Sequence, residues 1–195
     1  MSEPTSRCIL IRHGATEWSK NGRHTGRTDL PLLPEGEVQA RELAPLVDSL
    51  DIRRALVSPL QRARTTANLA GLADRSEIDD DLLEWDYGDM EGRTSAEIAE
   101  TRPGWNLFVD GPTNGETIED VAARVDRVIA RVKASGETVA AVAHGHVLRV
   151  LGARWLGEDP HLGQHLLLDP ATISVLAWEH GAPAIKTWNS RGALS

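Results

Sequence analysis

The sequence predicts an α/β fold, a three-layer α/β/α sandwich in which helices cover both faces of a mainly parallel sheet. Short apolar runs rich in β-forming residues alternate along the chain with amphipathic helical patterns, an order that favours parallel strands joined by helical crossovers. Three of these runs lead directly into histidine- or arginine-bearing segments. Ligands in open parallel sheets bind beyond the carboxyl ends of the strands, so these segments are the candidate site.

The first predicted strand covers residues 7–11 and ends at Arg12-His13-Gly14. Residues 14–34 hold three glycines, two prolines and many polar groups, which indicates a long functional loop. Apolar residues at helical spacing through residues 43–50 predict a helix, and Pro45 predicts a kink or break in it.

Residues 55–57 form the second predicted strand. Ser58 and Pro59 then resemble an N-cap and the first residue of a helix, which we expect to continue to about Leu72. These assignments place the polar residues that follow Pro59 at the edge of the sheet.

Residues 79–115 are irregular and form an expected insertion, with one short helix opened by the capping-box pattern at 94–97. The clearest helix follows, because residues 118–132 carry one continuous apolar stripe. Thr117 is its candidate N-cap, and Gly136 ends it.

Residues 138–143 are a third buried strand, and a helix is expected from about 147 to 156. Two late strands are expected at 173–178 and 184–188. Because no linker, repeat or low-complexity tract interrupts the sequence, we expect residues 1–195 to be a single domain.

Charge and composition exclude several classes of protein. Acidic residues outnumber basic ones 29 to 21, and the formal charge of −8 argues against nucleic-acid partners and anionic membranes. The single cysteine, Cys8, allows no intrachain disulfide, and no apolar stretch approaches the length of a membrane span. The absence of an apolar signal core near the start favours a cytoplasmic protein.

The predicted topology brings four residues together at one edge of the sheet, namely Arg12, His13, Arg62 and His144. Such a basic cluster needs an anion, and guanidinium groups match phosphate oxygens two at a time. A neutral imidazole can attack phosphorus, and water then cleaves the phosphohistidine. These residues predict phosphate chemistry but do not show which histidine is the nucleophile.

A leaving oxygen also needs a proton, for which a carboxylic acid is a natural donor. Within the irregular segment, residues 83–88 offer two carboxylates, Glu84 and Asp86. Residue chemistry alone leaves the choice between them open.

Six short motifs, in this order, resemble those of the histidine phosphatase superfamily, which has the phosphoglycerate-mutase-like fold. They cover nearly the whole chain: residues 10–14; Trp18 with 25–26 and 28–32; 58–63 with 65–67; 83–84 with 87–88; 115–117; and 143–146. The resemblance implies that His13 is the phosphorylated nucleophile and Glu84 the general acid and base. It also implies that Arg12, His13, Arg62 and His144 hold the phosphoryl group.

The motif combination is most similar to the acid phosphatases and the sedoheptulose-1,7-bisphosphatase-like sugar bisphosphatases of this family. We therefore expect hydrolysis of a small phosphomonoester, such as a sugar phosphate, without metal or cofactor. The remainder of the substrate is expected to meet loop residues: Trp18, Ser19, Arg23, His24, Thr25, Gly26, Arg27 and His146.

Two alternatives stay open at this point. A cofactor-dependent phosphoglycerate mutase is disfavoured by the 27 residues between Gly88 and Glu116, which leave little room for the mutases' longer insertion. A catalytically silent phosphate-binding module is disfavoured by the intact set of site residues. The sequence also leaves open whether the protein forms a homodimer.

Overall fold

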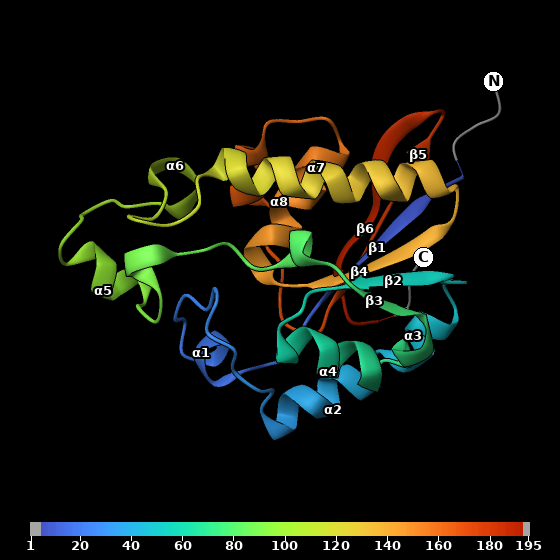
Figure 1. Ribbon diagram of the computed structural model, residues 1–195, viewed down its shortest axis with the longest axis horizontal. Coiled ribbons are helices and arrows are strands. Elements are labelled where there is room, and N and C mark those ends of the chain that lie inside the picture. Colours follow the sequence, from blue (N-terminus) through green and yellow to red (C-terminus); the bar gives the residue numbers. More distant parts are fainter. Residues whose placement is uncertain (1–4, 193–195) are drawn as a thin grey trace.

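The computed structural model describes residues 5–192, and within them one six-stranded sheet runs in the order β3-β2-β4-β1-β5-β6 (Figure 1). The neighbouring strands pair in parallel from β3 to β1, whereas β5 is antiparallel to β1 and β6 is antiparallel to β5. The predicted α/β class with a mainly parallel sheet is confirmed. The strands are β1 (Arg7–Arg12), β2 (Arg54–Val57), β3 (Ser76–Ile78), β4 (Thr138–Ala143), β5 (Ile173–Glu179) and β6 (Ala182–Ser190).

The two central strands determine where the polar residues meet. Strands β1 and β4 are almost entirely apolar and buried, as strands covered on both faces must be. Their register pairs Arg12 with Ala143, and the His13 amide donates to the Ala143 carbonyl oxygen at 3.0 Å. His13 and His144, the next residues on each strand, therefore emerge side by side.

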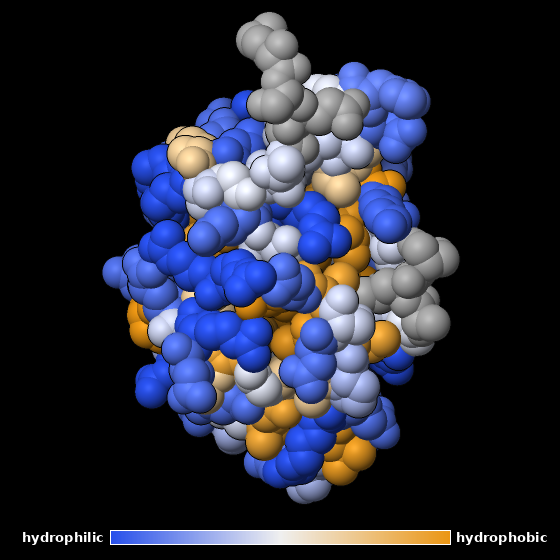
Figure 2. Space-filling model, turned by 90° about the vertical axis from the view of Figure 1, so that its right-hand side faces the viewer, coloured by the Kyte–Doolittle hydropathy of each residue, from blue (hydrophilic) through white to orange (hydrophobic). Residues whose placement is uncertain are grey.

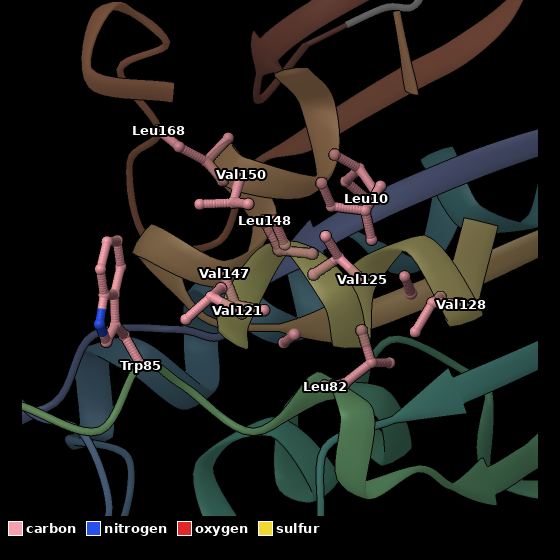
Figure 3. Close-up of a cluster of buried hydrophobic side chains, with 14 of the residues drawn as sticks. Leu10, Leu82, Trp85, Val121, Val125, Val128, Val147, Leu148, Val150 and Leu168 are labelled. Carbon is pink, nitrogen blue, oxygen red and sulfur yellow. The ribbon is translucent and has the colours of Figure 1, made fainter. Parts of the chain in front are cut away.

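Helices pack on both faces of the sheet, which confirms the three-layer arrangement (Figure 1). One face is covered by α2 (Pro34–Glu42), α3 (Ala44–Asp48) and α4 (Gln61–Leu69), and the other by α7 (Ile118–Ser135) and α8 (Gly145–Trp155). Figure 3 shows the core on the second face, where valines of α7 meet Leu10 of β1 and Leu148 of α8. At the end of the molecule shown in Figure 2, mostly hydrophilic side chains surround smaller apolar areas.

The long helix follows its local sequence closely. Thr117 caps α7 and forms the reciprocal capping box with Asp120, and Gly136 ends the helix in the left-handed conformation. The break predicted at Pro45 is also present, because α2 ends at Glu42 and α3 begins at Ala44.

Three local assignments differ from the sequence prediction. Helix α4 begins at Gln61 rather than Pro59, with Leu60 as its N-cap, and the Ser58 hydroxyl is hydrogen-bonded to both the Leu60 amide and His144. The expected loop 14–34 contains the short helix α1 (Glu17–Lys20), stabilised by its own capping box. Strand β3 had no sequence signal, because all three of its residues are exposed.

The irregular segment 79–115 extends beyond the strand ends at the left of Figure 1. Its predicted helix is confirmed as α5 (Ser95–Ala99), capped by Thr94. Three further elements of this segment had not been predicted: the four-residue α6 (Leu107–Asp110), and 3₁₀ turns at Asp80–Leu82 and Gly88–Met90. Other 3₁₀ turns lie at Ala73–Arg75 and Pro160–His165.

Across the part of the chain that the structure describes, none of the helices has the length and apolar character needed to cross a membrane.

Candidate active site

A cavity of about 230 Å³, here called the main cavity, opens beside the point where β1 ends and α8 begins. Most of the residues expected at the site line it: Arg12, His13, Ser19, Arg23, His24, Thr25, Glu84 and His146. Arg62 and His144 lie fully buried beside these residues and outside the cavity lining, and Gly26 is also outside it. The main cavity therefore brings together the first loop, the 84–87 segment and the start of α8.

His13 is 4% exposed, and its ring orientation is fixed by one short contact. Its Nδ1 lies 2.7 Å from the Gly14 carbonyl oxygen, which can only accept, so Nδ1 carries the proton. Burial, followed by the positive charges of Arg62 and Arg12, holds the pKa of His13 well below its usual range. The ring is thus neutral at pH 7, with its lone pair on Nε2.

Gly14 must be glycine for the strand end to pack closely. A Cβ atom at this position would lie 2.3 Å from the carbonyl oxygen of Gly36 in α2. The Gly14 amide also donates to the Thr66 hydroxyl at 3.1 Å, which ties the loop after β1 to α4. These contacts position the backbone that carries His13.

Arg12 offers a donor that the protein does not use. Its Nη1 donates to the Leu168 carbonyl oxygen, whereas its Nε is buried without a hydrogen-bond partner. No other buried side-chain nitrogen or oxygen within residues 5–192 lacks a partner. An unpaired buried donor is costly, so Arg12 Nε is the site's clearest indication of a missing acceptor such as a phosphoryl oxygen.

Arg62 connects the first loop to His144. Its Nε donates to His144 Nδ1 at 3.0 Å, and its Nη1 donates to the Thr28 carbonyl oxygen at 2.8 Å. Its Nη2 donates to the carbonyl oxygens of Gly26 at 2.9 Å and Thr25 at 3.1 Å. Arg62 thus holds the loop in place and supplies positive charge to the site, although most of its donors are already engaged.

His144 is buried and neutral, with both ring nitrogens engaged. Nδ1 accepts from Arg62, so Nε2 carries the proton and donates to the Ser58 hydroxyl at 2.7 Å. Burial, and then the charge of Arg62, lowers the pKa of His144 well below its usual range. The rings of His13 and His144 meet edge-on, 5.1 Å apart. Of the two imidazoles, only His13 has a nitrogen without a partner in the described residues.

Glu84 is 3% exposed and accepts three backbone N–H bonds. Its Oε1 accepts from the amides of Trp85 and Val147, each at 2.9 Å, and its Oε2 accepts from the His146 amide at 3.0 Å. Two of these amides belong to the first turn of α8, where the helix dipole favours a carboxylate. Oε1 thus accepts two of these bonds and Oε2 accepts one.

Asp86, the other candidate acid, lies outside the main cavity. Its carboxylate accepts from the Gly88 amide at 3.0 Å and lies 3.8 Å from Arg27 Nε. Arg27 also pairs with Glu116 at 3.3 Å and is likewise outside the cavity lining. Of the two carboxylates that the sequence left open, Glu84 is the one that reaches the cavity.

Several loop residues of the cavity wall are already engaged in the fold. Arg23 forms a two-pronged pair with Glu97 at 3.1 and 3.2 Å. Ser19 belongs to the capping box of α1, and Trp18 packs against Gly92. Gly26 faces the protein, since a Cβ there would lie 2.6 Å from the Trp85 carbonyl oxygen.

Sequence reasoning missed several cavity residues, above all Tyr87 and Arg149. The Tyr87 hydroxyl lies 2.5 Å from His146 Nδ1. Arg149 follows His146 by three residues on α8 and lies over the Phe108 ring at 4.8 Å. That i, i+3 spacing was the available signal, because it places both side chains on one side of the helix. Gly22, Ser95, Gly145 and Leu168 complete the lining.

The family model described as histidine phosphatase superfamily (branch 1) matches residues 8–191. A sedoheptulose 1,7-bisphosphatase of Saccharomyces cerevisiae is 39% identical over 189 residues, covering 80% of this chain and 70% of the relative. An acid phosphatase of Mycobacterium tuberculosis is 37% identical over 179 residues, covering 90% and 88%.

The fold is shared with solved structures at similar identity. A functionally characterised open reading frame from Mycobacterium tuberculosis superposes with a TM-score of 0.90 at 34% identity, covering 94% of this chain and 97% of that one. The family expected from the six motifs is confirmed by the family model and by these relatives. The chain belongs to the histidine phosphatase superfamily.

Proposed function

We propose that this protein is a phosphatase that hydrolyses small phosphate monoesters through a phosphohistidine at His13. The observation that carries the proposal is the pairing of two unused groups in one cavity. His13 is neutral with Nε2 free, and the buried Nε of Arg12 has no acceptor. A phosphoryl group satisfies both, because its oxygens accept and its phosphorus is electrophilic. The names of the similar proteins, a bisphosphatase and an acid phosphatase, support this activity.

In the first half-reaction, His13 Nε2 attacks phosphorus and the bond from phosphorus to the ester oxygen breaks. The departing alkoxide takes the proton held on Glu84 Oε2, leaving the alcohol and a Glu84 carboxylate. The three backbone amides around Glu84 are arranged to stabilise that carboxylate as it forms. The proton on Nδ1 stays on Nδ1, and its hydrogen bond to the Gly14 carbonyl oxygen stabilises the cationic phosphoimidazole.

In the second half-reaction, a water molecule occupies the position left by the alcohol. Glu84 takes one proton from the water, the resulting hydroxide attacks phosphorus, and the bond from phosphorus to Nε2 breaks. Inorganic phosphate leaves, and His13 and Glu84 return to their starting protonation states. The same carboxyl group thus acts first as an acid and then as a base.

Arg12, Arg62 and His144 support both steps electrostatically. Arg12 donates Nε to a phosphoryl oxygen, and Arg62 supplies charge and holds the loop through its bonds to three carbonyl oxygens. Their positive charges also keep His13 neutral, which preserves its lone pair for attack. We further propose that the described residues act as one catalytic domain, because strands on both sides of segment 79–115 belong to one sheet.

A labelling experiment tests this function. The protein is mixed briefly with a ³²P-phosphate ester and quenched, and acid-labile protein-bound label is measured together with release of inorganic phosphate. Wild type should carry up to one label per chain, and His13→Ala should show neither label nor turnover. Full turnover by His13→Ala would reject the mechanism, and binding without turnover by wild type would indicate a silent module. Isomerisation of phosphoglycerate in the presence of 2,3-bisphosphoglycerate, rather than phosphate release, would indicate a mutase.

A further inference from the structure

A second cavity adjoins the main cavity and has no role in the chemistry described above. Its volume is about 220 Å³, and four residues line both cavities: His24, Ser95, His146 and Arg149. A substrate whose phosphate lies against His13 would extend past these shared residues into the second cavity. The groups displayed at the junction therefore select the part of the substrate next to the ester.

Two histidine rings lie at this junction, and both are fixed in orientation. The rings of His24 and His146 are parallel within 5°, with centroids 6.1 Å apart. The His24 ring also packs edge-on against Tyr87 at 5.1 Å and Trp105 at 5.4 Å. These contacts leave little freedom for either ring. Whether the exposed nitrogen of each ring donates or accepts is therefore determined by the hydrogen bond that the second nitrogen of the same ring makes.

His146 presents a donor to the cavities. Burial, and then the charge of Arg149, lowers the pKa of His146 well below its usual range, so its ring is neutral. Burial also raises the pKa of Tyr87 well above its usual range, so the hydroxyl keeps its proton. That hydroxyl has no other acceptor within residues 5–192, so it donates to His146 Nδ1 at 2.5 Å. The proton of the neutral ring then resides on Nε2.

His24 presents an acceptor where His146 presents a donor. Its Nδ1 lies 2.9 Å from the Arg93 carbonyl oxygen, which can only accept, so Nδ1 donates and Nε2 is the nitrogen that can offer a lone pair. Neither Nε2 atom has a protein partner in the described part of the chain, and neither is sealed from solvent. One donor and one acceptor thus meet the substrate from two fixed, neighbouring rings.

We propose, on the basis of the phosphatase function above, that His24 and His146 together recognise a hydroxyl group next to the phosphate ester. A hydroxyl both donates and accepts, so it can donate to His24 Nε2 and accept from His146 Nε2. An anionic group fits less well, because the lone pair of His24 would face its negative charge. A metal ion lacks ligands here, since the described residues hold no group of three or more side chains that could coordinate one.

The second cavity suits the rest of a polyhydroxylated molecule. Trp105 supplies aromatic surface, on which the C–H face of a sugar can pack. The side chains of Ser95 and Gln164, and the Nδ2 of Asn106, make no hydrogen bond within the described residues and line the same space. The preferred substrates are therefore phosphate esters of sugars or other polyols rather than of simple alcohols.

Three esters of equal carbon number separate this effect from binding of the phosphate. Propyl phosphate, 1,2-propanediol 1-phosphate and glycerol 1-phosphate differ in having none, one or two hydroxyl groups. Wild type should show a kcat/KM about tenfold higher for the propanediol ester than for propyl phosphate, as expected for hydrogen bonds that one ester makes and the other lacks. In His24→Phe and His146→Phe this ratio should fall to within about twofold of unity.

The ratio between esters is the readout, because it cancels a general loss of activity in a variant. His161→Phe is the matched control: His161 pairs with Asp159 at 2.6 Å, lies outside both cavities, and should keep the wild-type ratio. If His146→Phe fails to fold, Tyr87→Phe replaces it, since it removes the bond that fixes the His146 proton and should lower the ratio partway.

Folded variants at His24 and at His146 or Tyr87 that keep the wild-type ratio would overturn the proposal, as would a wild type without preference among the esters. Absence of hydrolysis of all three esters by wild type would instead contradict the proposed function, so the two failures are distinguishable.

Discussion

Replacing Glu84 by glutamine removes the proton donor and acceptor while nearly preserving side-chain volume. Loss of general acid–base catalysis costs about 10² to 10⁴-fold in rate, or roughly 2.7 to 5.5 kcal/mol of transition-state free energy. The structure adds a second contribution, because three backbone amides donate to the carboxylate. An amide side chain offers one oxygen to them and turns its NH₂ toward at least one N–H. We therefore expect the upper half of that range for Glu84→Gln.

The choice of leaving group separates the chemical from the structural contribution. A nitrophenolate leaves without a proton, whereas an alkoxide needs one. With p-nitrophenyl phosphate, Glu84→Gln should form the phosphoenzyme readily but hydrolyse it slowly, because the second step still lacks its base. Stopped-flow absorbance should then show a burst of nitrophenolate close to one equivalent per chain, followed by slow turnover. An alkyl phosphate should show no burst.

Asp86→Asn is the matched control. Asp86 lies two residues from Glu84 but outside the main cavity, where its carboxylate accepts from the Gly88 amide. Its rate should stay within about threefold of wild type, as expected for a group remote from the reacting atoms. A larger loss in Asp86→Asn than in Glu84→Gln would refute the assignment of the acid. If Glu84→Gln slowed the hydrolysis of p-nitrophenyl phosphate and of the alkyl phosphate equally, without a burst, Glu84 would have only a structural role.

Further predictions concern the strand ends. Burial and two arginines lower the pKa of His13. We therefore expect kcat/KM to stay high as the pH falls through 6.5 and to decline only at more acidic pH, where the ring protonates. A pH–rate profile with an acidic limb at 6.5 or above would contradict this. Arg62→Ala should lose about 3–5 kcal/mol of transition-state binding, measured as kcat/KM, because it leaves a buried hydrogen-bond network unpaired. Arg64→Ala, on the exposed side of the same helix, should change kcat/KM little. A loss below about tenfold in Arg62→Ala would show that Arg62 is dispensable. Gly14→Ala should lower both the thermal midpoint and kcat, since its Cβ would lie 2.3 Å from the Gly36 carbonyl oxygen, and a wild-type midpoint in thermal unfolding would contradict the close approach.

The net charge of −8 describes the whole surface and not the site. The main cavity is lined by Arg12, Arg23 and Arg149 but by a single carboxylate, Glu84. A few cationic groups in a partly enclosed space can create a local positive potential on an acidic protein. The expectation that the protein avoids nucleic acids and anionic membranes is thus compatible with binding of a small phosphate ester.

Elements with strong local signals were predictable because their information lies within a few residues. The helix after Thr117 has its cap, apolar stripe and terminal glycine in continuous sequence, and it folds as these imply. The strand 138–143 has its predicted bounds because a fully buried strand needs an unbroken apolar run. Strand β3 lacked such a signal, because its exposed residues form a strand only through pairing with β2.

The sequence by itself determined which residue types follow the strands and that parallel pairing would bring them to one edge. Only the tertiary structure decided which nitrogen of each histidine is free, because that depends on a partner distant in the chain or on local backbone geometry. His144 is fully engaged by Arg62 and Ser58, His13 keeps Nε2 open, and Glu84 rather than Asp86 faces the cavity. Residue identity sets what chemistry is available, whereas burial and hydrogen bonding set which atom carries the proton, and three-dimensional packing alone supplies these.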